Sequence, residues 1–295
     1  MNRGKNTLIV SFLAVPLALY VLFVLAPYAS ALIFAFTRWS GLSANITFNG
    51  FNNFIKLYSD EKFWNALSHN AIALIVLPPI IAAIALFFAF IFTQGIKFAR
   101  GFRIAYFFPQ VLSVVIVAVL WGFIYHPTIG LLNAALEALG FTQMHAFPWL
   151  GDRSTVFGSV LGVVVWQSVG FYMVLFVAGM NAIPSDYYEA ARIDGATPWQ
   201  LFWSVTVPLL WDTIRTAIVF LAIGAMDLFG IVTVMTNGTG GPSRAADVAP
   251  VYLYSKAFSE GQFGYATAMG LVLLILVLGL SVISLRFTAR EAVEY

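Results

Sequence analysis

The most polar stretch of this chain is residues 183–200, IPSDYYEAARIDGATPWQ, which lies between two long apolar segments. The chemistry available here is charge and hydrogen bonding at helix ends. Residues 187–193 contain no helix breaker, and Ser185 or Asp186 can accept hydrogen bonds from the free N–H groups of a first turn. Gly195 then supplies the left-handed backbone that commonly ends a helix.

A second short helix is predicted directly after this break. Thr197 can cap it, Pro198 suits the first helical position, and Gln200 completes a capping box. Pro208 marks the start of the next long apolar segment. The stretch therefore predicts a pair of short helices held outside the bilayer.

Several kinds of chemistry are excluded by the residues that are missing. The chain has no cysteine and three histidines, whose spacing suits no metal site. No Gly-x-x-x-x-Gly-Lys-Ser/Thr phosphate loop occurs, and a net charge of +2 is too small to argue for nucleic acid. We expect no catalytic residue, no metal, no cofactor and no nucleic-acid partner.

The composition is that of a membrane protein. The 295 residues are 61% hydrophobic and 9% charged, whereas soluble domains are about 25% charged. The first apolar run is far longer than the roughly 7–15 apolar residues of a signal peptide, so we interpret it as a retained span. Six runs are long enough to cross a bilayer, which takes about 20 apolar residues: residues 8–36, 70–93, 104–125, 156–180, 209–235 and 265–287. Pro78 and Pro79 predict a kink in the second.

Basic residues near the span ends predict the orientation. With the N-terminus inside, nine basic residues are cytoplasmic or close to the inner face, and six lie in three long outer loops. Short loops carry most weight in this rule, and the short loop 94–103 holds Lys97, Arg100 and Arg103. Both termini and the Glu189 loop are therefore predicted to be cytoplasmic.

Asp227 is the one acidic side chain predicted to lie near the middle of a span. Insertion of such a residue costs roughly 2.5–3.5 kcal/mol, so it should face water or a partner. Lining a pathway and making a structural hydrogen bond are equally compatible with its position.

Aromatic and amide side chains within the spans suggest the ligand. They suit a neutral, polyhydroxylated molecule, although each could instead face lipid or a neighbouring helix. No basic residue lies at membrane depth to favour an anion, since Arg215 sits close to the cytoplasmic side. The candidate pathway residues are Trp166, Gln167, Tyr172, Asp227 and Phe229, and Trp121 is of the same type.

Glu189-Ala190-Ala191, followed by Gly195 and then Pro208, resembles the EAA loop of binding-protein-dependent ABC importer permeases. In that family the loop docks into a cleft of a cytoplasmic ATPase. The alternative is an ordinary amphipathic loop helix, because Glu-Ala-Ala alone is common. The resemblance implies ATPase coupling through Tyr188, Glu189, Ala190, Ala191, Asp194 and Gly195.

Three further motifs are similar to the carbohydrate-type, maltose-permease-like branch of this family. They are Gly50–Phe54, the stretch 126–133 with His126 where asparagine is usual, and the turn Asn237–Pro242. The resemblance implies a second homologous permease subunit, an ABC ATPase dimer, an extracytoplasmic sugar-binding protein and surrounding membrane lipid as partners.

We therefore expect an all-α membrane protein with six transmembrane helices and the type I ABC importer (MetI-like) permease architecture. Its expected parts are a tail and first helix (1–36), an extracytoplasmic loop (37–68) and a permease domain (69–290) with the cytoplasmic EAA loop at 183–207. The predicted function is import of a sugar or oligosaccharide across a bacterial or archaeal plasma membrane, with ATP hydrolysed by a partner. Alternatives are a related polar solute such as sn-glycerol 3-phosphate, or secondary transport, which the absence of internal repeats disfavours.

Overall fold

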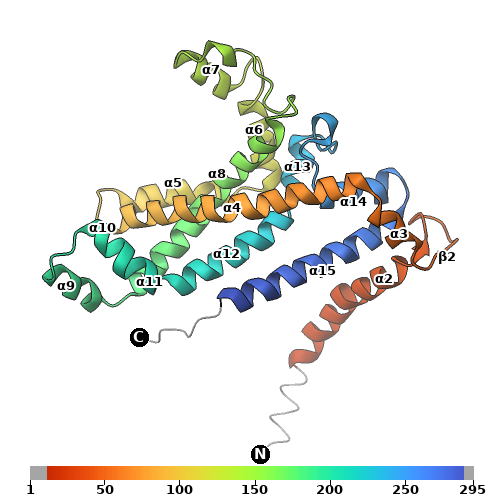
Figure 1. The fold of residues 1–295 in the computed structure, drawn as a ribbon, viewed down its shortest axis with the longest axis horizontal. Coiled ribbons are helices and arrows are strands. Elements are labelled where there is room, and N and C mark those ends of the chain that lie inside the picture. Colours follow the sequence, from red (N-terminus) through yellow and green to blue (C-terminus); the bar gives the residue numbers. More distant parts are fainter. Residues whose placement is uncertain (1–11, 289–295) are drawn as a thin grey trace, which may run out of the picture. The chain divides into compact units, whose positions relative to one another are not determined.

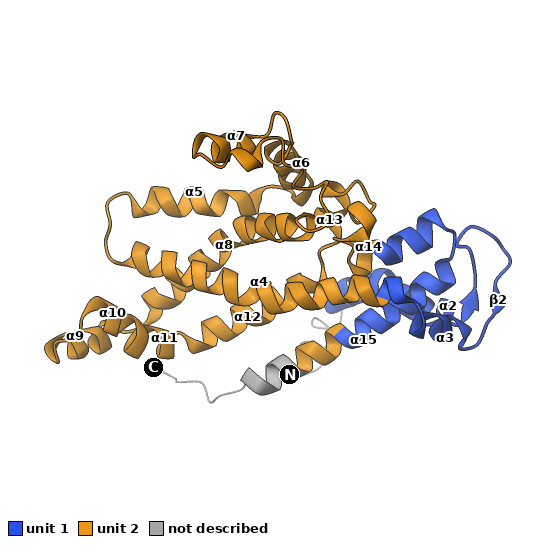
Figure 2. Ribbon diagram, turned by 45° about the horizontal axis from the view of Figure 1, so that its top comes forward, with its two compact units in different colours: residues 1–63, 252–276 blue, residues 64–251, 277–295 orange. Residues whose placement is uncertain are grey.

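The computed structural model describes residues 12–288, and the side chains of residues 12–282. Within this range the protein is built almost wholly of helices (Figure 1). Arg3, Lys5 and Arg290, which contribute to the predicted orientation, lie outside the described residues. The chain divides into two compact units, residues 1–63 with 252–276 and residues 64–251 with 277–295 (Figure 2).

The first unit joins the beginning of the chain to its last long helix. It holds the apolar helix Phe12–Phe34, whose final part is α2 (Ala26–Phe34), and a short antiparallel pair, β1 (Thr37–Arg38) and β2 (Thr47–Phe48). It continues with α3 (Asn52–Tyr58), a π-helical turn at Ser255–Ser259 and the start of α15 (Phe263–Thr288).

Asp60 ties the distant segments of this unit together. Its carboxylate accepts hydrogen bonds from the N–H groups of Lys62 and Phe63 at 3.1 and 3.2 Å, and so caps the next helix. It also accepts from the hydroxyls of Tyr252 at 3.0 Å and Tyr265 at 2.6 Å. Burial raises the pKa of Asp60, but these hydrogen bonds outweigh burial and hold the pKa below its ordinary value of 3.8.

The lowered pKa of Asp60 predicts an acid-sensitive stability. The folded state favours the carboxylate, so this stabilisation is fully present above the unfolded-state pKa, about 3.9, and is lost as the pH falls through the folded-state value. Asp60→Asn should therefore lower the melting temperature near neutral pH and flatten its decline below about pH 5. The exposed neighbour variant Glu61→Gln should keep the wild-type profile. Parallel melting curves for Asp60→Asn and wild type across this pH range would contradict the assignment.

The second unit contains the remaining helices. They are α4 (Glu61–Thr93, which begins at the unit boundary), α5 (Ala99–Val111), α6 (Val114–Ile124), α7 (Leu131–Ala138), α8 (Val156–Ala182), α9 (Ser185–Ile193), α10 (Pro198–Leu201), α11 (Val207–Leu209), α12 (Trp211–Met226), α13 (Phe229–Met235) and the first half of α14 (Ala249–Tyr254), whose last three residues belong to the first unit. A π-helical turn, η3 (Phe202–Thr206), joins α10 to α11, and short 3₁₀ turns lie at Thr142–Met144 and Pro242–Arg244.

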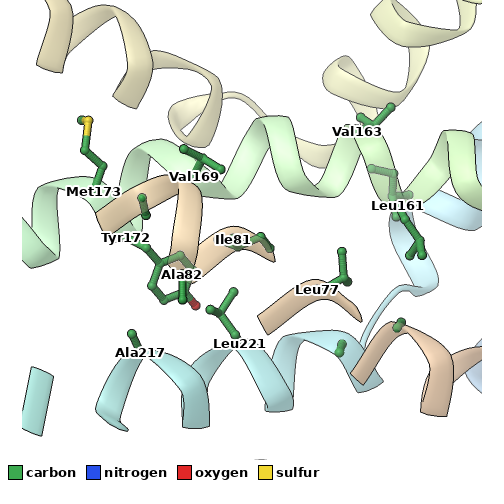
Figure 3. Close-up of a cluster of buried hydrophobic side chains, with 14 of the residues drawn as sticks. Leu77, Ile81, Ala82, Leu161, Val163, Val169, Tyr172, Met173, Ala217 and Leu221 are labelled. Atoms are coloured by element: carbon green, nitrogen blue, oxygen red, sulfur yellow. The ribbon is translucent and has the colours of Figure 1, made fainter. Parts of the chain in front are cut away.

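The core of this unit forms around α8, which packs against α5, α6, α12 and α13. Leu77 and Ile81 of α4, Met173 of α8, and Ala217 and Leu221 of α12 are buried in one apolar cluster (Figure 3). Large apolar side chains on the outer faces of the long helices remain exposed. Helices that are apolar on both their inner and outer faces are typical of a bilayer environment.

Glycine allows α5 and α8 to approach backbone to backbone. A Cβ atom at Gly170 of α8 would overlap the carbonyl oxygen of Tyr106 in α5 and lie 2.9 Å from the Cα atom of Phe107. Close contacts of this kind are how small residues bring membrane helices together. Gly170 therefore determines how closely these two helices pack.

The lengths and apolar character of the helices agree with six predicted spans. Four described helices can cross a membrane by themselves. Two bent pairs, Ala99–Val111 with Val114–Ile124 and Pro198–Leu209 with Trp211–Met226, bring the number to six when each pair is counted as one span. One boundary differs from the prediction. The second span starts at Glu61, within the predicted 37–68 loop, and its helix runs through Pro78 and Pro79.

The third span, predicted to be continuous over 104–125, is broken. Helices α5 and α6 meet at an angle of 101°. The break lies at Leu112–Ser113, where Leu112 is extended and the Ser113 side chain caps α6 by accepting from the N–H of Val115. The predicted turn at 237–242 is confirmed, since Asn237, Gly238, Gly240 and Gly241 all have positive φ.

Candidate functional site

The polar stretch 183–200 forms the predicted helix, break and helix. Helix α9 begins at Ser185, but its N-cap is Pro184 and no side chain caps it, so the prediction of a Ser185 or Asp186 cap was wrong. Proline at this position sets an extended backbone that can enter a helix without a side-chain cap. Gly195 has φ +82°, which confirms the left-handed break.

The second short helix begins as predicted. The Thr197 hydroxyl accepts from the N–H of Gln200, and the Gln200 side chain accepts from the N–H of Thr197 at 2.8 Å, which completes the capping box. Pro198 occupies the first helical turn. Reciprocal caps make α10 a defined helix of only four residues.

Together α9 and α10 form an exposed surface, called here the loop surface (residues 185–203). No residue of α9, all of which is described, is buried. The Glu189 carboxylate is exposed, and no described residue pairs with it. Tyr187, Ile193, Trp199 and Trp203 leave large apolar side chains exposed, with Ile193 at 86%. An exposed apolar patch that carries an unpaired charge is typical of a surface that binds another protein.

Tyr188 connects the loop surface to the helices behind it. Its hydroxyl lies 3.2 Å from the Thr206 hydroxyl in the π-helical turn η3. A cavity of about 240 Å³ lies beside this hydrogen bond, lined by Tyr188, Arg192 and Thr206 and by the ends of α4 and α8. Of the six predicted coupling residues, Tyr188 and Ala191 are half-buried, and Glu189, Ala190, Asp194 and Gly195 are exposed.

The fifth span is broken at its acidic residue. Helix α12 ends at Met226 and α13 begins at Phe229, so Asp227 stands in the break with φ −111° and ψ 71° rather than inside a continuous helix over 209–235. Backbone that leaves the helix at membrane depth is tolerated where it is buried in protein or lines a polar cavity. The break therefore marks Asp227 as part of a candidate site.

A cavity of about 180 Å³ opens at this break. Gln167 and Tyr172 of α8 line it together with Asp227, and Ser168 and Leu228 lie beside them. The Gln167 amide donates to the Leu112 carbonyl at 3.4 Å, which leaves the amide oxygen for other partners. No described residue donates a hydrogen bond to the Asp227 carboxylate, which is exposed to the cavity.

Two of the predicted pathway residues lie elsewhere. Trp166 packs edge-on against Trp121, with ring centroids 5.4 Å apart, and lines a separate cavity beside Tyr106 and Pro109 of α5. Phe229 packs against the apolar core. The structure thus brings together three of the five candidates, Gln167, Tyr172 and Asp227.

Residues 54–291 match the family described as "Binding-protein-dependent transport system inner membrane component". The chain belongs to this family. The match includes both the loop surface and the cavity at Asp227. It also places this inner membrane component among transport permeases.

Relatives of this inner membrane component are named for sugar uptake. The permease protein NgcF of a diacetylchitobiose uptake system, from Streptomyces coelicolor, is 40% identical over 282 residues, which cover 92% of this chain and 80% of that protein. The permease protein MsmF of a multiple sugar-binding transport system, from Streptococcus mutans serotype c, is 31% identical over 283 residues, covering 95% and 94%.

A solved structure confirms the fold. The bacterial alginate ABC transporter, crystallised in complex with an alginate pentasaccharide-bound periplasmic protein, contains a chain that superposes with a TM-score of 0.83. The likeness covers 99% of this chain and 97% of the other, at 21% identity. The architecture is therefore that of an ABC importer permease.

Some site residues of this inner membrane component were missed by sequence reasoning. Ser168 and Phe220 line the cavity at Asp227, but neither residue type is unusual in an apolar helix. Asn70, which contacts the break, is a buried amide inside a span, and its polarity was the available signal.

Proposed function

We propose that this chain is a permease subunit of an ATP-driven, binding-protein-dependent importer of a neutral sugar or oligosaccharide. The observation that carries the substrate class is the cavity at the break of the fifth span. An amide, a phenol and a carboxylate converge there, and these groups can donate to and accept from sugar hydroxyls. The names of NgcF and MsmF support the same class.

The charge of the residues that line the cavity favours a neutral substrate over an anionic one. None of the described residues that line the cavity is basic, and Asp227 is acidic. A uronate or a phosphate would meet a like charge with no compensating cation. Although the alginate transporter has the same fold, its acidic substrate does not suit this cavity, and sn-glycerol 3-phosphate is disfavoured for the same reason.

The proposed function also implies the partners of the permease. An ABC ATPase dimer docks at the loop surface, where Glu189 supplies an unpaired charge and the nearby aromatic side chains supply apolar contact area. A second homologous permease subunit completes the pathway, membrane lipid surrounds both, and an extracytoplasmic sugar-binding protein delivers the substrate. The complex of the alginate transporter with a periplasmic protein supports this last partner.

Orientation can be tested by labelling. The proposal places both termini and the loop surface in the cytoplasm, and the turns around Asn49 and Ser243 outside. Because the chain has no cysteine, single-cysteine variants report unambiguously. Asn49→Cys and Ser243→Cys should react in intact cells with a membrane-impermeant maleimide, and Thr197→Cys should react only after lysis. Outside labelling of Thr197→Cys would reverse the topology.

Asp227 provides the test of the pathway. Asp227→Asn keeps the shape and removes the charge, so the complex should assemble and melt normally. Loss of a charge-assisted hydrogen bond to a sugar hydroxyl should raise the KM for uptake of a neutral test sugar such as diacetylchitobiose by roughly tenfold. Exclusion of an acidic oligosaccharide should weaken at the same time. Uptake is measured in proteoliposomes with the purified complex and its binding protein.

A second variant distinguishes lining from structure. Asp227→Leu also removes the polar group, and a residue that only lines the pathway can lose it without loss of assembly. If Asp227 instead has a structural partner in another subunit, leucine leaves that partner unsatisfied, at a cost of about 1–3 kcal/mol. A lower melting temperature or a missing subunit would then move Asp227 out of the pathway.

A further inference from the structure

Asn70 of α4 is fully buried, at 0% exposure, and lies against the break of the fifth span. Its side-chain amide donates to the carbonyl oxygens of Ala225 and Met226 at 3.2 and 3.3 Å. Its side-chain oxygen accepts from the N–H of Ala249 at 2.9 Å. All of these residues belong to the second unit, and one side chain thus bonds to two segments far from it in sequence.

These three hydrogen bonds go to backbone groups that helix geometry leaves without partners. Ala225 and Met226 are the last residues of α12, and Ala249 is the first residue of α14. The last carbonyls and first N–H groups of a helix have no partner inside it, and at membrane depth no bulk water replaces one. Asn70 therefore makes a broken helix tolerable at this point.

The neighbouring residue attaches to the same region. The His69 ring nitrogen Nδ1 lies 2.6 Å from the carbonyl oxygen of Asp247, and the ring packs against Phe157 at 4.8 Å. Two adjacent residues of α4 thus bond both to the break beside Asp227 and to the segment 247–249.

We propose that Asn70 is a positioning residue for transport, which holds the fifth span broken so that Asp227 faces the cavity. Without its amide, the carbonyls of Ala225 and Met226 can find partners by continuing the helix, since the N–H groups four residues later would then bond to them. A continued helix would carry the side chain of residue 227 away from its present place. The inference rests on the proposed function, because it gives Asp227 a place in the pathway.

The chain contains a matched control. Asn133 of α7 is also buried, and its amide donates to the carbonyls of Pro127 and Phe147 at 2.9 and 3.0 Å. Its oxygen accepts from the Trp149 ring N–H at 2.6 Å. Asn133 thus also donates to two backbone carbonyls and accepts one hydrogen bond, but none of its partners lines the cavity at Asp227. A merely structural role for Asn70 predicts the same behaviour for the two residues.

The experiment measures the reactivity of a thiol at position 227. Asp227→Cys places a single cysteine in this subunit, and a water-soluble methanethiosulfonate is applied to the purified complex. Adding Asn70→Ala should slow modification by about tenfold or more, the size of the coupling between contacting groups. Adding Asn133→Ala should leave the rate within about twofold, as expected for residues without shared partners. Equal rates in the two double variants would overturn the proposal.

Uptake provides the second measurement. Asn70→Ala should raise the KM for the neutral test sugar, and the rise should largely vanish in an Asp227→Asn background, because both changes remove the same interaction. Independent effects of Asn70→Ala and Asp227→Asn would contradict the proposal. If the Asn70→Ala variant does not assemble, Asn70→Asp can replace it. Aspartate keeps the shape of the side chain and the oxygen that accepts from Ala249, but it loses the N–H groups that donate to α12. Its effect on the KM is compared with and without Asp227→Asn in the same way. The labelling assay tests the role of Asn70 and does not depend on transport. If Asp227 is not part of the pathway, the labelling rates should still differ as expected, and only the uptake results should fail.

Discussion

Glu189→Lys should abolish ATP-driven uptake while the permease remains folded and inserted. Glu189 is exposed on a helix without buried residues and has no partner among the described residues, so the change costs the isolated subunit little. At a docked interface the reversed charge loses an attraction and gains a repulsion, and charge pairs of this kind are worth roughly 2–5 kcal/mol when buried between partners. We expect at least about thirtyfold weaker ATPase association, or ATP hydrolysis that no longer drives uptake.

Three further variants delimit this result. Glu137→Lys reverses an exposed charge on α7 and should transport normally. Gly195→Val places a β-branched residue at φ +82° and should strain the break by about 1 kcal/mol or more, whereas Gly195→Asn tolerates this backbone and should couple. Uptake, ATPase activity and co-purification of the ATPase are measured for all variants. Normal coupling in both Glu189→Lys and Gly195→Val would remove the loop surface from the mechanism.

Gly170→Ala should prevent normal assembly of the permease, although it adds a single methyl group. The new Cβ atom would overlap the backbone of Tyr106, and a backbone cannot move aside as a flexible side chain can. Helix α5 would have to separate from α8, at a cost of about 3 kcal/mol, the upper end of overpacking penalties. The expected result is a melting temperature lower by several degrees and a reduced yield of complex in size-exclusion chromatography.

The same helix supplies the control for this substitution. Gly158 of α8 has no heavy atom within 4 Å of the place where its Cβ would lie. Gly158→Ala should therefore leave the melting temperature unchanged or slightly raise it, since alanine favours helix over glycine by up to about 1 kcal/mol. Equal stability of the two alanine variants would show that α5 and α8 do not pack as closely as described.

Hydropathy and local helix signals predicted much of this fold. The spans follow from continuous apolar runs, and the capping box at Thr197 and the break at Gly195 follow from residue types whose backbone preferences act locally. Such features depend on neighbours in the chain, so a sequence contains the information to find them. The cap at Pro184 shows the limit of this approach, because Ser185 and Asp186 fit the capping preference equally well and neither caps.

The breaks in the third and fifth spans could not be predicted in this way. Hydropathy stays high across Leu112–Ser113, because a break between two apolar helices does not change the mean hydropathy of the segment that contains them. At Asp227 the sequence indicated an expensive acid but not an open helix. The partner that makes the break tolerable is Asn70, which is more than 150 residues away from Ala225 in sequence. Pairing over such a distance leaves no local pattern.

The hydrogen bonds of Asp60 also have a consequence for biogenesis. The two tyrosines that bond to Asp60 lie 192 and 205 residues further along the chain. At a synthesis rate of about 5–20 residues per second, the ribosome takes roughly 10–40 s to deliver them after Asp60. During that interval the first apolar helix is already made, while the tyrosines and the helix that begins at Phe263 do not yet exist. The first unit can therefore close only after Tyr252 and Tyr265 have been synthesised, and a nascent chain that stops before residue 252 leaves Asp60 without either hydroxyl donor.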